Sequence, residues 1–178
     1  MNGDRVFHIG DKVVYPNHGV GVIEQIGTRT IGTAVEKFYL LKINSTSSLK
    51  VMVPFHNAAN VGLRPVVRNG EIQKIVDFLS SGVCSNAQDW KDRFKENSER
   101  MRTGYLMDVA AVLKSLLILG QTKSLSFREK KMLERARYLL VSELAISKNC
   151  EECQIEQVLA KALTKCNLRF PELAELAS

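Results

Sequence analysis

Residues 6–65 alternate apolar and polar positions with a period of two, which is typical of β-strands. A first strand, over residues 7–16, is predicted to stop at its proline, because proline cannot donate a hydrogen bond to a neighbouring strand. Glycines from residue 19 onward predict a sharply bent second strand, which Thr28 to Ile31 either continue or end. Two further strands are predicted at residues 36–43 and 49–54. Four or five short strands in this length predict a small SH3-like or Tudor-like barrel.

After residues 64–70 the period of the apolar positions changes from two to 3.6, which is typical of amphipathic helices. We therefore expect an all-β plus all-α protein of two domains, a barrel at residues 1–67 and a compact five-helix domain at residues 71–178. The predicted helices are one from Ile72 to Gly82, one containing Trp90, two near residues 106–120 and 127–148, and a final one with Glu151 and Glu152 in its first turn.

Capping signals mark the start of two of these helices. The motif Ser126-x-x-Glu129 is a clear capping box and begins the longest helix. The helix with Trp90 has two candidate starts, because Ser85-x-x-Gln88 matches a capping box and Asp89 is a capping residue placed later. With the later start, Trp90 is the first helical residue; with the earlier start, it lies in the second turn.

The helix near residues 106–120 is apolar over a wider arc than one packing face requires, because it also carries Ile118 and Leu119. A helix buried on several sides explains this arc, and so does a protein-contact surface at Leu117-Ile118-Leu119. The final helix is predicted to be structural and to use one apolar face, made of Ile155, Val158, Leu159, Ala162 and Leu163.

The net charge is +6 and the pI is about 9.2, which favours an anionic partner. The surplus is local: residues 90–137 hold twelve Lys and Arg against six Asp and Glu, whereas residues 138–178 hold four against six. Arg128 and Lys130 lie in the first turn of the longest helix, where cations oppose the helix dipole. Phosphate contact and a solvated charged face are both open interpretations of this arrangement.

Several function classes are not supported by the sequence. No apolar segment is long enough to cross a bilayer and no signal region precedes the barrel, so we expect a cytoplasmic protein without membrane contact. The chain has no nucleotide-binding glycine loop and no catalytic cluster, so we expect neither enzyme activity nor a cofactor. Cys150-x-x-Cys153 and Cys166 lack a second ligand pair or a nearby His, and we expect free thiols rather than a metal site.

Trp90 is the only Trp, and cations lie on both sides of it. One interpretation places it in the core, since large aromatic residues are mostly buried and Phe94 follows at helical spacing. The other is a wedge, in which the ring is inserted into a partner and Lys91, Arg93 and Lys95 hold the partner in place. In the wedge interpretation Phe94 packs inward and Trp90 points outward.

The chain contains five motifs in an unbroken order over about residues 5–165: Val13-Val14-Tyr15-Pro16-x-His18-Gly19, Thr28-Arg29-Thr30-Ile31, Val51-x-Val53-Pro54-x-x-Asn57-Ala58, Trp90-x-x-Arg93-Phe94-Lys95-x-Asn97 and Leu125-Ser126-x-x-Glu129-Lys130-x-Met132-Leu133. Together they resemble the CarD/CdnL family of bacterial transcription regulators. The part up to about Pro65 is also similar to the polymerase-interacting domain of the transcription-repair coupling factor.

The resemblance implies a two-domain regulator, for which a monomer is sufficient, that binds bacterial RNA polymerase at promoters. Its barrel would dock on the lobe of the polymerase β subunit, partly by strand pairing. Its helical domain would contact promoter DNA at the upstream fork of the transcription bubble and stabilise the open complex without strong sequence specificity. The residues implied for polymerase binding are Arg29, Thr30, Ile31, Leu49 and Met52. Those implied for DNA binding are Trp90 as a minor-groove wedge, with Arg93, Lys95, Arg128 and Lys130.

Three positions depart from the family pattern. Many relatives have Arg at Met52, so a charged polymerase contact is expected to be weaker or replaced here. Some have a basic residue at Asp92, which removes one expected phosphate contact. Leu117-Ile118-Leu119 replaces a polar stretch found in some relatives, so contacts on that side are not transferred.

Two other hypotheses stay open at this point. One is a protein-only adaptor, in which the helical domain recruits another protein through Leu117-Ile118-Leu119 and Trp90 is buried. The other is a thiol or metal sensor that acts through Cys150, Cys153 and Cys166. The sequence does not determine which promoters respond, or whether transcription from them rises or falls.

Overall fold

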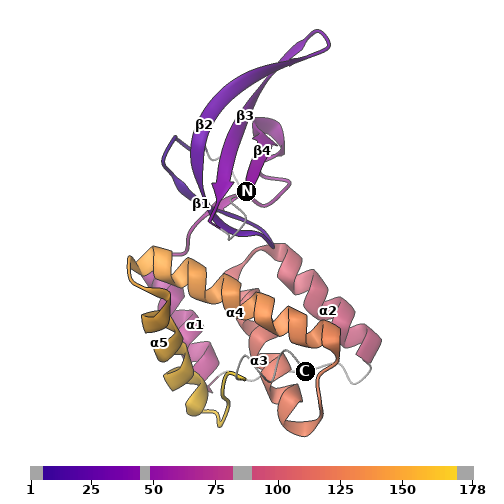
Figure 1. Cartoon of the computed structure of the whole chain (residues 1–178), viewed down its shortest axis with the longest axis vertical. Helices are drawn as coiled ribbons and strands as arrows, with labels where there is room; N and C mark the ends of the chain where they lie inside the picture. Colours follow the sequence, from indigo (N-terminus) through magenta and orange to yellow (C-terminus); the bar gives the residue numbers. More distant parts are fainter. Residues whose placement is uncertain (1–5, 45–48, 82–89, 172–178) are drawn as a thin grey trace. The chain divides into compact units, whose positions relative to one another are not determined.

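The computed structural model describes residues 6–44, 49–81 and 90–171 of the chain. The chain separates into two compact units, Met1–Val66 and Val67–Ser178 (Figure 1). Val67, the last residue of the domain predicted at residues 1–67, packs in the core of the second unit.

The first unit is a five-stranded antiparallel sheet with the strand order β4-β3-β2-β1-β5. Its elements are β1 (Lys12–Tyr15), β2 (Gly19–Ile31), β3 (Ala34–Ile43), β4 (Lys50–Pro54), the short 3-10 helix η1 (Phe55–Asn57) and β5 (Arg64–Pro65). The all-β prediction for this part of the chain is confirmed.

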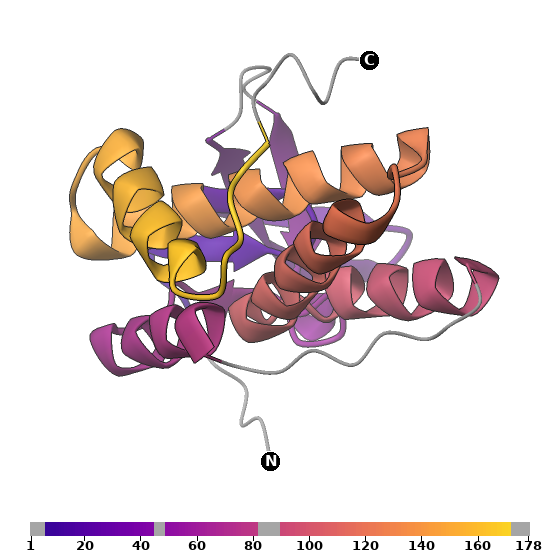
Figure 2. The same cartoon turned by 90° about the horizontal axis from the view of Figure 1, so that it is seen from below.

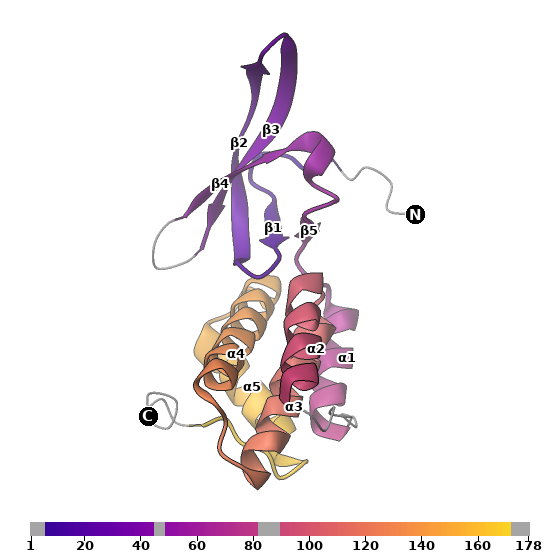
Figure 3. The same ribbon diagram turned by 90° about the vertical axis from the view of Figure 1, so that its right-hand side faces the viewer.

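The long hairpin of β2 and β3 dominates this sheet and extends beyond its other strands (Figure 3). β2 is continuous, so Thr28 to Ile31 continue the strand. The register between the two strands shifts between Ile23 and Gln25, which is the irregularity expected of a bent strand. Gly21 lies so close to β3 that an added Cβ would be 2.7 Å from the carbonyl oxygen of Lys42. Glycine is therefore required there by close backbone approach.

The core of the first unit forms around Tyr39 of β3, which is almost fully buried. Its ring stacks on Phe55 with a centroid separation of 4.0 Å, and its hydroxyl accepts a hydrogen bond from the backbone N–H of Phe7 at 3.2 Å. The sequence pattern ends the strands before Arg64–Pro65, but this pair forms β5 against Val13 and Val14 of β1. Pro65 is tolerated because β5 is an edge strand.

The second unit contains five helices among the described residues, in agreement with the predicted all-α domain (Figure 2). α3 packs against α1, α2 and α4, and α5 packs against α1 and α4. The helices are α1 (Asn69–Ser81), α2 (Trp90–Thr103), α3 (Leu106–Thr122), α4 (Phe127–Lys148) and α5 (Glu152–Thr164).

The wide apolar arc of α3 belongs to the core of this unit. Leu113 and Leu116 are fully buried, Leu117 is buried, and Ile118 and Leu119 are partly buried against the same cluster. The arc is therefore explained by burial on several sides. On α5 the predicted apolar face is too wide by one position: Val158 is 47% exposed, whereas the other four predicted residues are buried.

One charged side chain, Lys114 of α3, is 1% exposed. Its Nζ donates a hydrogen bond to the carbonyl oxygen of Phe78 at 2.8 Å and lies 5.2 Å from the centre of the Phe78 ring. Cys166 Sγ lies 3.6 Å from the same Nζ and donates to the carbonyl oxygen of Ser80 at 2.9 Å. Both interactions satisfy carbonyl groups in the last turn of α1, which intrahelical bonds leave open.

Candidate functional site

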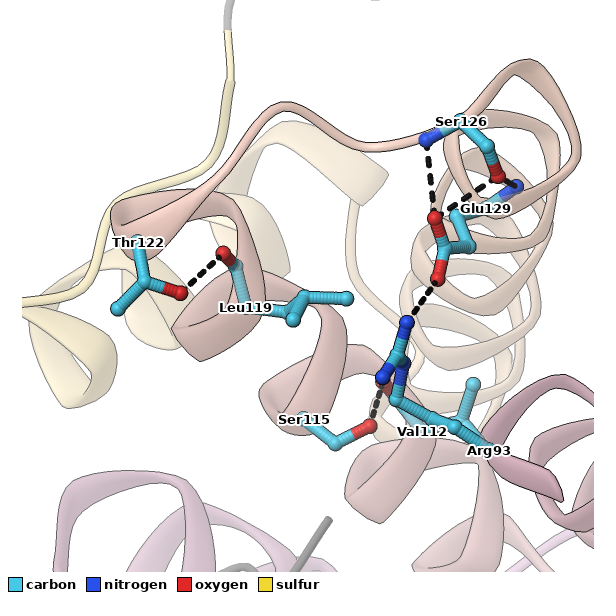
Figure 4. Close-up of polar contacts among 7 residues, drawn as sticks. All are labelled: Arg93, Val112, Ser115, Leu119, Thr122, Ser126 and Glu129. Carbon is cyan, nitrogen blue, oxygen red and sulfur yellow. Dashed lines mark hydrogen bonds and ion pairs between the residues drawn. The ribbon is translucent and has the colours of Figure 1, made fainter. Parts of the chain in front are cut away.

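A buried ion pair connects the first turn of α2 to the first turn of α4. Arg93 and Glu129 are each 3% exposed, and Nη2 of Arg93 donates to Oε1 of Glu129 at 3.1 Å (Figure 4). Such a pair is strongly directional, and removal of one partner leaves the other charge buried without compensation. The starts of the two helices are therefore held together by a specific contact.

The same carboxylate completes the cap of α4. Oε2 of Glu129 accepts from the backbone N–H of Ser126 at 2.9 Å and from its hydroxyl at 2.8 Å, and the Ser126 hydroxyl accepts from the Glu129 N–H at 3.3 Å. The predicted capping box is thus confirmed. Burial alone would raise the pKa of Glu129, but hydrogen bonds from Ser126 and the Arg93 guanidinium outweigh it and hold that pKa below its usual value.

Arg93 requires a correction to the predicted site. We expected a DNA contact from its guanidinium, but the structure buries this group between α2 and α4, on Glu129. The helical spacing predicts that Arg93 and Asn97 share one face of α2. It does not predict that this face packs against the core. Its structural role is to hold the start of α2.

The inward face of α2 is formed by Arg93, Asn97 and Met101, which are all buried. Phe94, which we expected to pack inward as the anchor, is only half-buried. Asn97 is 3% exposed, and its Nδ2 has no hydrogen-bond partner among the described residues. The inward face of α2 is therefore more polar than the predicted one.

Trp90 is the first residue of α2 as described. Its side chain and residues 82–89, which include the candidate caps Ser85 and Asp89, lie outside the described residues. The wedge and the core interpretations of Trp90 both stay predictions.

The remaining predicted DNA-binding residues are accessible near these two helix starts. Lys95 and Arg128 are exposed, and Lys130 is half-buried. Because Arg93 links the first turns of α2 and α4, the cations of both helices belong to one end of the helical unit. Lys95, Arg128 and Lys130 are together called the cationic end below.

Near the cationic end, the sequence pattern gave no role to Phe127 and only a capping role to Glu129. Phe127, the first residue of α4, is 73% exposed, and Lys131 Nζ lies 5.8 Å from the centre of its ring. Phe127 could have been identified from the sequence, because it is an apolar residue outside the apolar face of α4. Glu129 was recognised as a cap but not as the partner of Arg93, because no local pattern links positions 36 residues apart.

The predicted polymerase-binding residues lie on β2 and around β4. Arg29 and Thr30 are exposed, Leu49 is 40% exposed and Met52 is 46% exposed. The side chain of Ile31 lies outside the described residues.

The strand register shows how these positions are distributed over the sheet. Arg29 is opposite Glu36, and Met52 is opposite Leu40, which places Arg29 and Met52 on the face away from the core. Thr30 points to the other face, since neighbouring strand residues alternate. β4 is an edge strand of the sheet as described, with a free side for pairing.

Two further observations concern the described part of the chain. None of its groups of His, Cys, Asp and Glu side chains is suited to hold a metal ion, and Cys150, Cys153 and Cys166 are free thiols. No helix among the residues that the structure describes is long and apolar enough to span a bilayer.

Comparison with known proteins assigns both units. Residues 7–67 match the family model described as "CarD-like/TRCF RID domain", and residues 74–160 match "CarD, C-terminal domain". The chain is 33% identical over 151 residues to a protein of Bacillus subtilis (strain 168) named "Putative transcription factor YdeB", and the match covers 85% of this chain and 98% of that protein. The chain therefore belongs to the CarD family of transcription regulators, which are not enzymes.

Proposed function

We propose that this protein binds RNA polymerase through its first unit and stabilises the promoter open complex through the cationic end of its second unit. The observation that carries the proposal is the buried contact between Arg93 and Glu129. Trp90 is the first residue of α2 and precedes Arg93 by about one turn. Because Arg93 is bound to Glu129, this end of α2 stays next to the start of α4. An aromatic residue and cations from two helices are then available to one ligand.

This combination of groups suits the edge of a transcription bubble. An aromatic wedge must unstack a base step, which costs a few kcal/mol in intact duplex and less where the strands already separate. Cations on phosphates add affinity without reading the sequence. Phe127 supplies a second, exposed ring beside Lys131, and aromatic rings among cations are typical of surfaces that bind unpaired nucleotides. A protein that prefers the open form shifts the equilibrium toward it by that difference in affinity.

The first unit supplies a surface for the polymerase β-subunit lobe. Its edge strand β4 can accept an added strand, because one row of its backbone groups faces away from the sheet. Met52 and Arg29 on the outer face would contact side chains of the partner. Binding by strand addition would tolerate Met52 in place of a charged residue, since the backbone provides much of the contact. The protein would act in the cytoplasm, as a monomer on each polymerase.

The protein-only adaptor has weaker support. It requires an accessible partner surface at Leu117-Ile118-Leu119, but Leu117 is buried and the other two side chains pack against the core of their own unit. A thiol sensor is not favoured by any specific contact between Cys150, Cys153 and Cys166.

Replacement of Trp90 tests the proposal directly. We expect Trp90→Ala to shorten the protein-dependent part of the open-complex lifetime by about five- to a hundredfold, because one stacked base is worth about 1–3 kcal/mol. The lifetime is measured with bacterial RNA polymerase holoenzyme and promoter DNA after addition of a competitor. The melting temperature of the variant should stay close to that of the wild type. A large fall in melting temperature with an unchanged lifetime would show that Trp90 is a core residue.

Charge reversal tests the cationic end. We expect Lys95→Glu and Lys130→Glu each to weaken the effect and to lower the slope of log affinity against log salt by about one to two, because each variant removes a phosphate contact and adds an opposite charge. The measurement is open-complex stabilisation between low and physiological salt. Lys161→Glu in α5 is the matched control, since Lys161 is exposed, as Lys95 is, but lies on another helix. An equal effect of all three variants would mean that only net charge matters and that the cationic end is not a site.

A further inference from the structure

The chain passes from the first unit to the second through a very short connection. β5 ends at Pro65, which is paired with Val13 of β1. Val67 already belongs to the second unit, and its side chain is buried in the helical core. Val66 is therefore the single residue between the last paired strand position and that core.

Side chains of α4 hold Val67 on both of its backbone polar groups. Its N–H donates to Oε1 of Glu143 at 3.0 Å, and its carbonyl oxygen accepts a hydrogen bond from the hydroxyl of Ser147. Glu143 is 2% exposed, so water has little access to this contact. Rotation of Val67 would break both hydrogen bonds and leave its buried N–H without a partner, which is unfavourable.

The next residue is also constrained. The N–H of Arg68 donates to Oε2 of Glu71 at 3.1 Å, and its carbonyl oxygen accepts from the N–H groups of Glu71 and Ile72 in the first turn of α1. The chain is thus held from Val67 onward, and rotation in the connection is left to the bonds around Val66. A β-branched residue such as Val66 favours extended backbone and restricts this rotation further.

α4 joins this attachment point to the cationic end. Glu143 follows Glu129 by 14 positions in the same helix, which corresponds to a distance of about 21 Å along the helix axis. One part of α4 therefore holds the connection to the first unit, and its first turn holds Arg93 and the start of α2.

We propose that Glu143 and Ser147 are positioning residues that reduce the connection between the two units to a one-residue hinge at Val66. While the first unit is bound to polymerase, this hinge restricts the cationic end to a small volume near the DNA. A short, stiff connection raises the effective concentration of the cationic end at the DNA, although it adds no new contact. The functional part of this inference rests on the proposed function, whereas the hinge itself does not.

The hinge is tested by distances between spin labels in the whole chain. Labels are attached at Thr33→Cys and Lys161→Cys, two exposed positions in different units, after replacement of the four native cysteines by Ser. We expect a narrow distance distribution for this background and for Glu143→Gln, which keeps an acceptor oxygen for Val67. Glu143→Ala/Ser147→Ala, and separately an insertion of Gly-Ser-Gly-Ser after Val66, should broaden it. A broad distribution in the background itself would overturn the hinge.

The positioning role is tested by open-complex lifetimes for the same variants without labels. We expect the insertion and Glu143→Ala/Ser147→Ala to reduce the protein-dependent lifetime by roughly three- to tenfold, because the effective concentration falls with a longer or looser connection. Affinity for polymerase alone and for forked DNA alone should change less than about twofold. The insertion leaves every core contact in place, so misfolding cannot explain its effect. Unchanged lifetimes would overturn the positioning role, and a wild type without any effect on lifetime would overturn the proposed function but not the hinge.

Discussion

Arg93→Met is expected to lower the free energy of unfolding of the helical unit by about 3–5 kcal/mol, because it leaves the carboxylate of Glu129 buried without its charged partner. The two side chains are each 3% exposed and are joined at 3.1 Å, so little solvent is available to compensate. The change is measured by urea denaturation of the whole chain, followed by the fluorescence of Trp90. The effect on transcription should follow, since α2 loses its attachment to α4.

A matched control is available on the same helix. Arg100→Met removes an ion pair with Glu96 that is even shorter, 2.6 Å, but both side chains of that pair are about one-third exposed or more. An exposed pair of this kind contributes about 0–1 kcal/mol, so the control should be nearly as stable as the wild type. Equal destabilisation by both variants would contradict the special role of the buried pair.

The same pair predicts a pH dependence. The folded-state pKa of Glu129 lies below its usual value, so the ion pair contributes its full stability above the unfolded pKa, about 4.3. That contribution is lost as the pH falls through the lower, folded pKa. The difference in unfolding free energy between the wild type and Glu129→Gln should therefore be constant near neutral pH and shrink in acid. A difference that grows as the pH falls would contradict the assigned direction.

Lys114→Ala is the second change with a large expected effect, a loss of about 3–5 kcal/mol in the free energy of unfolding. Truncation removes most of a side chain that is 1% exposed and leaves the carbonyl oxygen of Phe78 without the ammonium donor that now lies at 2.8 Å. Cavity formation and an unpaired buried acceptor both contribute to the cost.

Lys114→Met separates these two contributions. The apolar chain of Met keeps most of the packing but cannot donate a hydrogen bond, so this variant should lose only about 1–3 kcal/mol. Urea denaturation of both variants provides the comparison. A Met variant as stable as the wild type would show that the ammonium group contributes nothing to α1, and one as unstable as the Ala variant would show that packing is unimportant at this position.

Sequence patterns predicted well those features that depend on neighbouring residues. The alternation of apolar residues in the first unit and the 3.6-residue period in the second predicted the two fold classes, because each pattern must turn its apolar side to a core. The capping box at Ser126 and Glu129 was also predictable, since its hydrogen bonds join residues three positions apart. The short strand at Arg64–Pro65 was not predicted, because two residues carry no periodicity and their pairing partner in β1 is distant in the sequence.

The candidate site was predictable only in part. Lys95, Arg128 and Lys130 are accessible, as cations near helix starts usually are. Arg93 belongs to the same motif and has the same charge, yet it is buried. Residue type cannot distinguish these cases, because burial of a charge is favourable only where a partner such as Glu129 meets it in the folded chain.

The two-unit organisation and the family could both be predicted from the sequence, because local periodicity and short motifs are properties of neighbouring positions. Three contacts became visible only in the folded chain: the buried pair of Arg93 and Glu129, the contact of Lys114 with the end of α1, and the hydrogen bonds of Glu143 and Ser147 to Val67. All three depend on the same property of the chain. These groups are separated by 36 to 80 positions along the chain, and their hydrogen bonds exist only after packing has excluded water from around them.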